Sequence, residues 1–89
     1  MDAEARIAAL ESAGVERVVL EVAEHAGRCL NRLRLGRAAA VDLDPEVLTQ
    51  EAIERFLDGR WTWDREKEPS IAEFLKSRIR SLISNALTS

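Results

Sequence analysis

The sequence predicts a small all-helical bundle of about four helices in one domain. Eighty-nine residues are enough for one compact core and too few for two. Hydrophobic residues make up 46% of the chain, and only four Gly and two Pro interrupt it. Alanine, leucine, glutamate and arginine are abundant, a mixture that favours helices. Apolar residues also recur at three-and-four spacing in several segments, so we treat residues 1–89 as a single helical domain.

The first half of the chain predicts two helices. The first runs from Asp2 to about Ser12, because acids favour the positive start of a helix and Gly14 offers a left-handed stop. The second is the longest and runs from Val15 to about Leu35. Its expected core stripe consists of Val15, Val18, Val19, Val22, Ala26, Cys29, Leu30 and Leu33.

The third predicted helix has a strong start signal. Asp44 is placed to cap it, and Pro45 stands at the first helical position, where its missing N–H costs nothing. The helix is expected to continue to Asp58, with Gly59 as its C-terminal stop. The expected inward residues are Leu48, Ala52, Ile53, Phe56 and Leu57.

A polar loop over residues 59–69 separates this helix from the last one. Ser70 and Glu73 match a capping box, in which each side chain satisfies a free backbone N–H. The helix is expected from Ile71 to about Ala86. Its expected apolar face consists of Ile71, Phe74, Leu75, Ile79, Leu82, Ile83 and Leu87, which completes a four-helix bundle.

Composition argues against several classes of protein. The lone Cys29 cannot form an intramolecular disulfide and the first residues lack a signal-peptide pattern, so we expect a cytoplasmic protein. No run approaches the roughly 20 apolar residues of a membrane-spanning helix. The net charge of −3 argues against tight, nonspecific nucleic-acid binding by the chain as a whole.

The sequence contains no motif with specific nucleotide or metal chemistry. Glu21, His25 and Cys29 recur every four residues, but they span about 12 Å along a helix, too far for one ion to bind all three. Adjacent pairs remain geometrically possible ligands, although Cys29 falls on the apolar stripe and is expected to be a core thiol. We therefore expect no enzymatic activity and no cofactor.

Residues 28–37, which cover the end of the second predicted helix and the residues just after it, contain four arginines and no acid. The arginines are Arg28, Arg32, Arg34 and Arg37. Cations are favoured near the negative end of a helix. One interpretation is pairing inside the chain with Asp42, Asp44 or Glu46. The other is a phosphate-binding patch.

Two ordered patterns in the second half carry a resemblance. The first consists of Leu48, Gln50, Glu51, Ala52, Arg55 and Leu57, and the second of Phe74, Leu75, Arg80 and Ser81. Together they resemble the core-binding and minus-ten-recognition domain, region 2, of bacterial RNA polymerase sigma factors of the extracytoplasmic-function type. The resemblance covers residues 48–63 and 70–85 well and residues 15–86 loosely. The sequence departs from the pattern at Val47, where an acid is usual, and at Ile71, where an aromatic is usual.

The resemblance implies a polymerase-binding face on the third helix. In the family, the equivalent helix docks on a coiled coil of the largest subunit of core RNA polymerase. The residues implied in that contact are Glu46, Gln50, Glu51, Glu54 and Arg55. An acidic helix face suits a basic partner, but a solvated acidic face is the alternative.

The resemblance also implies contact with promoter DNA. In the family, the loop after that helix and the start of the next helix capture unstacked bases of the minus-ten element. Aromatic rings interleaved with cations are what single-stranded bases stack on. The residues implied are Arg60, Trp61, Trp63, Lys76, Arg78 and Arg80. The alternative is that one tryptophan, Trp63 rather than Trp61, caps the end of the bundle, and that Asp64, Glu66 and Glu68 cancel the local charge.

A competing interpretation is a non-catalytic interaction or regulatory module that forms a homodimer. Trp61, Trp63 and Ile71 distinguish the two: an outward position near Arg78 favours nucleic acid, and burial at a symmetric contact favours a dimer. Sigma factors carry a second, helix-turn-helix domain for which 89 residues leave no room. A fragment and a stand-alone module therefore both remain open.

Overall fold

The computed structural model describes residues 2–33 and 43–88 of the chain. These residues form four helices: α1 (Ala3–Ala13), α2 (Val15–Leu33), α4 (Pro45–Leu57) and α5 (Ile71–Thr88). Within the two described ranges there is no strand, so the predicted all-helical bundle is confirmed. None of the described helices is both long enough and apolar enough to cross a bilayer.

The ends of α1 and α4 follow the capping residues read from the sequence. The Asp2 carboxylate accepts a hydrogen bond from the Ala5 N–H at 2.7 Å, and the Asp44 carboxylate accepts one from the Glu46 N–H at 2.7 Å. Gly14 and Gly59 follow α1 and α4 with φ values of 90° and 81°, in the left-handed region that favours glycine.

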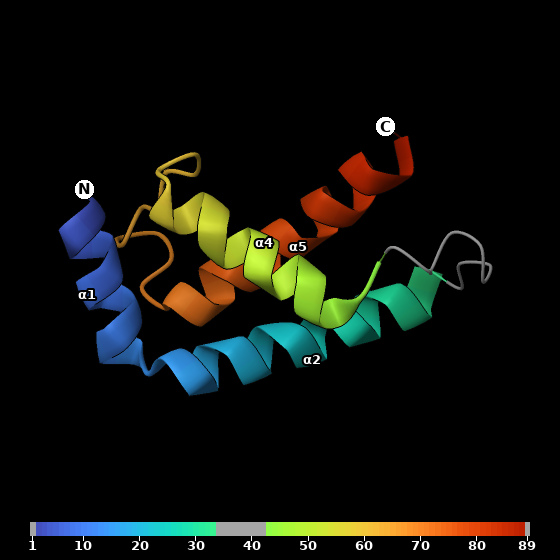
Figure 1. Cartoon of the computed structure of the whole chain (residues 1–89), viewed down its shortest axis with the longest axis horizontal. Helices are drawn as coiled ribbons and strands as arrows, with labels where there is room; N and C mark the ends of the chain where they lie inside the picture. Colours follow the sequence, from blue (N-terminus) through green and yellow to red (C-terminus); the bar gives the residue numbers. More distant parts are fainter. Residues whose placement is uncertain (1, 34–42, 89) are drawn as a thin grey trace.

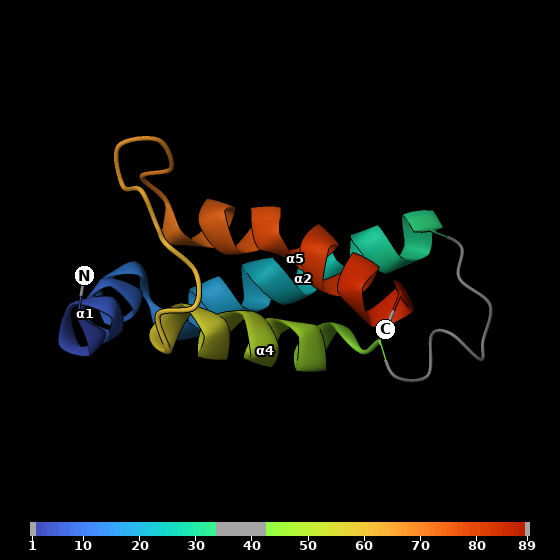
Figure 2. The same ribbon diagram turned by 90° about the horizontal axis from the view of Figure 1, so that it is seen from above.

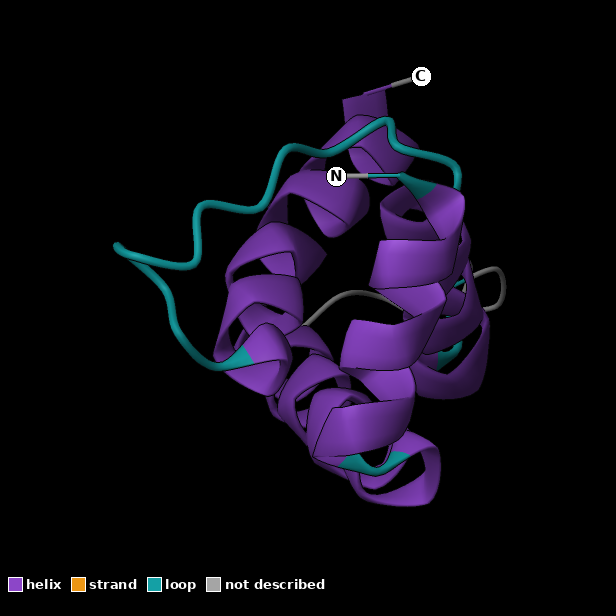
Figure 3. Cartoon of the chain, turned by 90° about the vertical axis from the view of Figure 1, so that its left-hand side faces the viewer, coloured by secondary structure: helices purple, strands orange, loops and turns teal. Residues whose placement is uncertain are grey.

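The three longer helices enclose the core. Figure 1 shows α4 crossing over α5 with α2 running beside both, and in Figure 2, seen from above, α4 and α5 lie on either side of the line of α2. α4 and α5 also pack directly on each other, where Phe56 meets Phe74. The short α1 lies across the end of the bundle where α4 finishes and α5 begins. The loop that joins α4 to α5 extends from this same end, as Figure 3 shows.

The core is one cluster to which α2, α4 and α5 all contribute. Phe56 and Leu75 are 0% exposed, and full burial of such a side chain stabilises the fold by about 1.5–3 kcal/mol. Thr49 is also buried, and its hydroxyl donates to the Pro45 carbonyl at 2.7 Å, so it leaves no unsatisfied donor. The cluster consists of Leu10, Val18, Val22, Ala26, Cys29, Leu43, Leu48, Ala52, Phe56, Ile71, Ala72, Phe74, Leu75, Ile79, Leu82 and Ile83.

Three residues assigned to apolar stripes lie outside this core. Val15 and Val19 are 42% and 37% exposed, and Leu87 is 44% exposed. Val19 is displaced by about 60° around the helix from Val22, so it falls at the flank of the buried stripe. Leu87 lies in the last turn of α5, where it borders a cavity. The expectation of core positions for these residues is wrong, and the burial of Leu33 lies outside what the structure describes.

The capping box of the last helix is only half formed. The Ser70 hydroxyl oxygen accepts a hydrogen bond from the Glu73 N–H at 3.4 Å. The Glu73 carboxylate does not return to Ser70 but accepts a hydrogen bond from the Lys76 ammonium at 3.2 Å. The ion pair with Lys76 thus takes the place of the second bond of the capping box, in which the Ser70 N–H would donate to the Glu73 carboxylate.

Candidate functional site

The acidic face of α4, which we define as Glu46, Gln50, Glu51 and Glu54, points away from the bundle. Glu46, Gln50 and Glu54 are exposed, and the side chain of Glu51 is 43% exposed. The opposite side of α4 buries Leu48, Thr49, Ala52 and Phe56. The described part of the chain therefore leaves this face open to another macromolecule.

Val47 adds an apolar side chain to the same side of α4. It is 53% exposed and follows Glu46 directly in the first turn. The sequence carried a signal for it, because an apolar residue stands where the sigma-factor pattern has an acid. An exposed apolar residue beside acids is a feature of contact surfaces as well as of ordinary protein surfaces.

Arg55 is held inside the chain. Its Nη2 donates to Glu51 Oε1 at 2.8 Å, and its guanidinium carbon lies 6.0 Å from the centre of the Trp61 ring. Its Nε is buried and has no hydrogen-bond partner among the residues that the structure describes. Arg55 thus links the acidic face to the tryptophans, and its pairing with a second molecule stays a prediction.

Four rings, which we call the aromatic cluster, gather where α4 ends and α5 begins: Phe56, Trp61, Trp63 and Phe74. Trp63 meets Phe56 edge-to-face at 5.8 Å between ring centres, and Trp61 meets Phe74 edge-to-face at 6.3 Å. Both tryptophans are partly buried against the core. Packing against the end of the bundle, the alternative expected of Trp63, is therefore found for both rings, while each ring keeps an exposed part.

The loop that carries the tryptophans is tied down by its own hydrogen bonds. Trp63 Nε1 donates to the Glu68 carbonyl at 2.6 Å. Between them, the Glu68 N–H donates to the Asp64 carbonyl at 2.9 Å, and the Asp64 carboxylate accepts from the Glu66 N–H at 3.0 Å. A loop ordered in this way loses less conformational entropy when it binds a partner.

Three cations lie against the aromatic cluster. The guanidinium carbon of Arg65 is 4.9 Å from the centre of the Trp63 ring, and that of Arg78 is 5.2 Å from the centre of the Phe74 ring. Arg55 over Trp61 is the third. Arg78 Nε, like that of Arg55, is buried without a hydrogen-bond partner in the described ranges. Aromatic faces beside unpaired donors can bind flat, anionic ligands such as nucleotides.

A groove of about 940 Å³ runs beside the aromatic cluster. Trp63 and Arg65 line it from the loop, and Ala5, Ala8 and Ala9 line it from α1. Sequence reasoning missed this groove because its lining comes from two stretches, residues 5–21 and 63–72, that are far apart in the chain. The one local signal for the groove was the series of alanines in α1, Ala5, Ala8 and Ala9, because small side chains let another surface approach closely.

The six residues predicted to contact DNA do not form one surface. Arg78 lies on the flank of α5 that carries Phe74. Lys76 lies on the other flank, where its ammonium is 3.2 Å from Glu73 Oε1 and 3.6 Å from Glu21 Oε2. Arg80 lies on that second flank too and borders a cavity with Arg32. Because each residue turns a helix by about 100°, positions 76 and 80 share a side that excludes position 78.

The remaining predicted cation, Arg60, is exposed at the end of α4. Its guanidinium lies 3.1 Å from the Asp58 carboxylate, with 62% and 53% of the two side chains exposed. Surface pairs of this kind are worth only about 0–1 kcal/mol. Arg60 therefore remains free to exchange Asp58 for another anion.

The arginines near the end of α2 do not pair as one interpretation expected. Arg28 and Arg32 are exposed, and neither forms an ion pair with Asp44 or Glu46. The Asp44 carboxylate is engaged as the cap of α4 instead. Pairing with those two acids is therefore wrong, while Arg34, Arg37 and Asp42 lie outside the described residues.

The Glu21, His25 and Cys29 series does not gather around one point. The Arg17 guanidinium donates to the Glu21 carboxylate at 3.1 Å, and this hydrogen bond lowers the pKa of Glu21. His25 Nε2 lies 3.4 Å from Cys29 Sγ, and Cys29 is buried as expected of a core thiol. Desolvation, together with the positive charges of Arg28 and Lys76, lowers the pKa of His25. Across residues 2–33 and 43–88, no three His, Cys, Asp or Glu side chains are grouped to hold a metal ion.

Comparisons of the chain with protein-family models, with curated proteins and with solved structures give no match. The function must therefore be inferred from the surfaces of the chain itself. Two of them adjoin: the acidic face of α4 and the aromatic cluster at its end, with Arg55 between them.

Proposed function

We propose that the chain is a sigma-factor-like transcription initiation module. Its acidic face docks on the coiled coil of the largest subunit of core RNA polymerase, and its aromatic cluster contacts single-stranded promoter DNA at the minus-ten element. The observation that carries the proposal is the continuity of these two surfaces through Arg55, which bonds Glu51 and lies over Trp61. The sequence resemblance assigns the same two roles to the same two segments.

The exposure of the acidic face supports the docking half of the proposal. Charge complementarity with a basic helix pair accelerates encounter and fixes orientation, more than it adds affinity. Affinity also needs apolar area, and Val47 is 53% exposed next to Glu46. A basic coiled coil with an apolar position opposite Val47 fits this combination.

The aromatic cluster supports the DNA half of the proposal. Stacking of a base on an aromatic side chain is worth about 1–3 kcal/mol, and it does not require a particular base. Arg65 and Arg78 lie beside the rings and can donate hydrogen bonds to a phosphate or to a base edge. Asp64 and Glu66 in the same loop offset their charge, so we expect little DNA binding unless polymerase brings the strand to the cluster.

The docking half is tested by binding to purified core RNA polymerase. We compare the native chain with the double variant Gln50→Ala, Glu51→Arg and expect at least about tenfold weaker binding, because a cation then faces the basic partner. Glu54→Arg changes the same face without removing the partner of Arg55 and should act in the same direction. Glu24→Arg, an exposed acid on α2, is the matched control. Native-like binding by both α4 variants would remove the docking face.

The DNA half is tested in the same complex. Trp61→Ala should keep core binding and reduce crosslinking to a single-stranded minus-ten probe by about tenfold, as expected for loss of one stacked base. Unchanged crosslinking in Trp61→Ala would assign the Trp61 ring to packing alone.

The competing function is a homodimeric interaction module. Leu20 is 61% exposed on α2 next to the exposed Val19, which favours a further contact there. Ile71, by contrast, is 3% exposed within the core of one chain, so it does not serve a symmetric contact. A dimer in sedimentation that Leu20→Glu abolishes, combined with no binding to core polymerase, would favour this function.

A further inference from the structure

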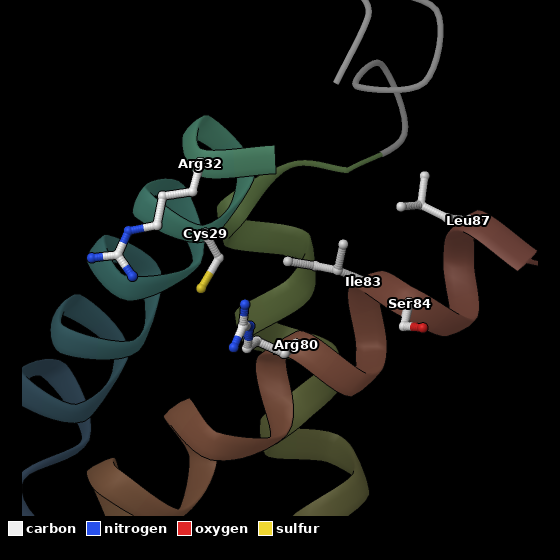
Figure 4. A pocket seen from close by; sticks show the side chains of 6 residues that line it. All are labelled: Cys29, Arg32, Arg80, Ile83, Ser84 and Leu87. Atoms are coloured by element: carbon white, nitrogen blue, oxygen red, sulfur yellow. The ribbon is translucent and has the colours of Figure 1, made fainter. Parts of the chain in front are cut away.

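A cavity of about 350 Å³ lies between the C-terminal parts of α2 and α5. Figure 4 shows the side chains that border it: Cys29, Arg32, Arg80, Ile83, Ser84 and Leu87. Its volume is within the range of about 300–1,000 Å³ that is usual for small-molecule sites. The cavity is on the flank of α5 that faces α2, away from Arg78 and the aromatic cluster.

One part of the cavity is apolar. Ile83 is 2% exposed and points toward Cys29, which is 7% exposed. Leu87 follows Ile83 by one helical turn and is 44% exposed, the one large apolar side chain of α5 that is exposed among the described residues. Because Ile83 and Cys29 are already almost covered, a ligand would remove apolar surface from water mainly at Leu87.

The other part of the cavity carries two cations from different helices. Arg32 comes from α2 and Arg80 from α5, and their guanidinium groups lie on either side of the Cys29 sulfur in Figure 4. Neither guanidinium has an acidic partner in the described part of the chain. Guanidinium groups bind carboxylates through paired, charge-assisted hydrogen bonds.

His25 lies next to the cavity, and desolvation is the largest cause of its lowered pKa. Desolvation and then Arg28 and Lys76 lower the pKa of His25, and Arg32 acts in the same direction. Glu73 on α5 opposes them, but its carboxylate is engaged by Lys76. His25 Nε2 lies 3.4 Å from Cys29 Sγ, so the imidazole is close enough to the cavity to sense a bound anion.

We propose that this cavity binds a small amphipathic carboxylate, an organic acid whose carboxylate lies between Arg32 and Arg80 and whose apolar chain lies on Cys29, Ile83 and Leu87. An inorganic anion would satisfy the two arginines but leave the apolar part empty. A neutral apolar molecule would leave the two charges unpaired. The site shares no residue with the acidic face or the aromatic cluster, so it stands whether or not the chain binds polymerase.

The test uses octanoate as the probe with the complete chain, in a titration followed by backbone amide NMR. We expect one saturable site, with the largest shifts at Cys29, Arg80 and Ile83. Acetate supplies the charge without the chain, and octanol supplies the chain without the charge. Burial of two methylene groups alone strengthens binding about tenfold, so octanoate should bind at least that much more tightly than acetate. Equal binding of octanoate and acetate, or of octanoate and octanol, would overturn the proposal.

Exposed residues provide variants that leave the core intact. Arg80→Gln should weaken octanoate binding by about tenfold through loss of a charge-assisted hydrogen bond, and Leu87→Ser should weaken it through loss of apolar contact. Arg60→Gln, which removes an exposed arginine elsewhere, is the matched control and should bind like the native chain. Bound octanoate should also raise the pKa of His25 in the native chain and not in Arg80→Gln. Native-like binding by Arg80→Gln, or shifts centred on Val19 and Leu20, would show adsorption to exposed apolar surface and refute the site.

Discussion

The two ends of the bundle use similar residue types in different ways. Where α4 finishes and α5 begins, four aromatic rings fill the space between the helices, and arginines lie on the outer faces of those rings. Where α2 and α5 approach their C-termini, aliphatic side chains meet and leave a cavity bordered by Arg32 and Arg80. Both ends therefore combine cations with apolar surface. We call the first the filled end, because rings occupy the space between α4 and α5 and the groove lies beside them against α1, and the second the open end, because in the described part of the chain its cavity lies between α2 and α5.

The two ends differ in the size of the side chains between their helices, and α1 lies across the filled end. Rings of Phe and Trp are large enough to bridge diverging helices. Ile83 and Leu87 are smaller, and the apolar surface of Leu87 stays 44% exposed. The filled end offers flat faces for stacking, whereas the open end offers a cavity that is partly open to solvent.

The largest expected effect is at the filled end. Phe56 is 0% exposed and contacts both Trp63 and Phe74, so Phe56→Ala should destabilise the fold by about 3–5 kcal/mol. Urea denaturation of the variant and the native chain measures the difference. At the open end, Ile83 already borders a cavity, so the loss of one methyl group in Ile83→Val should destabilise the fold by no more than about 1.5 kcal/mol. Equal losses in the two variants would contradict the comparison.

A smaller effect is expected where α4 turns into the loop of the filled end. Gly59 has φ of 81°, and a Cβ at that position would lie 2.5 Å from Arg6 Nη1. Gly59→Ala should therefore cost about 1–2 kcal/mol, the strain of a left-handed L-residue. Gly27→Ala is the matched control, because a Cβ there would meet Pro45 Cγ at an ordinary 3.8 Å inside a helix. The control should be neutral or more stable by up to about 1 kcal/mol, and a destabilised control would mean that the effect is not conformational.

Local signals in the sequence predicted most of the fold. Helix caps and glycine stops act over one turn of chain, so Asp44, Pro45 and Gly59 mark the ends of α4 without knowledge of its neighbours. Periodicity likewise identified the buried faces of α4 and α5. It failed at Val19, which falls at the flank of the buried stripe, and at Val15, because an apolar stripe does not show how far the neighbouring helices extend along it.

The candidate surfaces were only partly predictable. The exposure of Gln50 and Glu54 follows from the helical period of α4. The separation of Arg78 from Lys76 and Arg80 follows from the same period, but grouping cations by closeness in sequence obscured it. The cavity at the open end had no signal in the sequence, since its shape depends on where two distant helices diverge.

The smallest expected effect concerns His25, next to Cys29 of the open end. Its pKa in the folded chain is lowered from 6.5 by desolvation and by Arg28 and Lys76, so the unfolded chain binds a proton at a higher pH than the folded chain does. His25 therefore makes the free energy of unfolding fall as the pH drops below 6.5, and it has no such effect above that pH. The lowered pKa of Glu21 acts only near or below 4.5, in a separate range. Urea denaturation at pH 7.5 and at pH 5.5 should show this loss in the native chain and a smaller loss in His25→Gln. The one histidine of the chain is His25, next to the open end, and the filled end contains none. An equal loss of stability in His25→Gln would therefore mean that His25 does not cause the loss and that the open end does not oppose added positive charge.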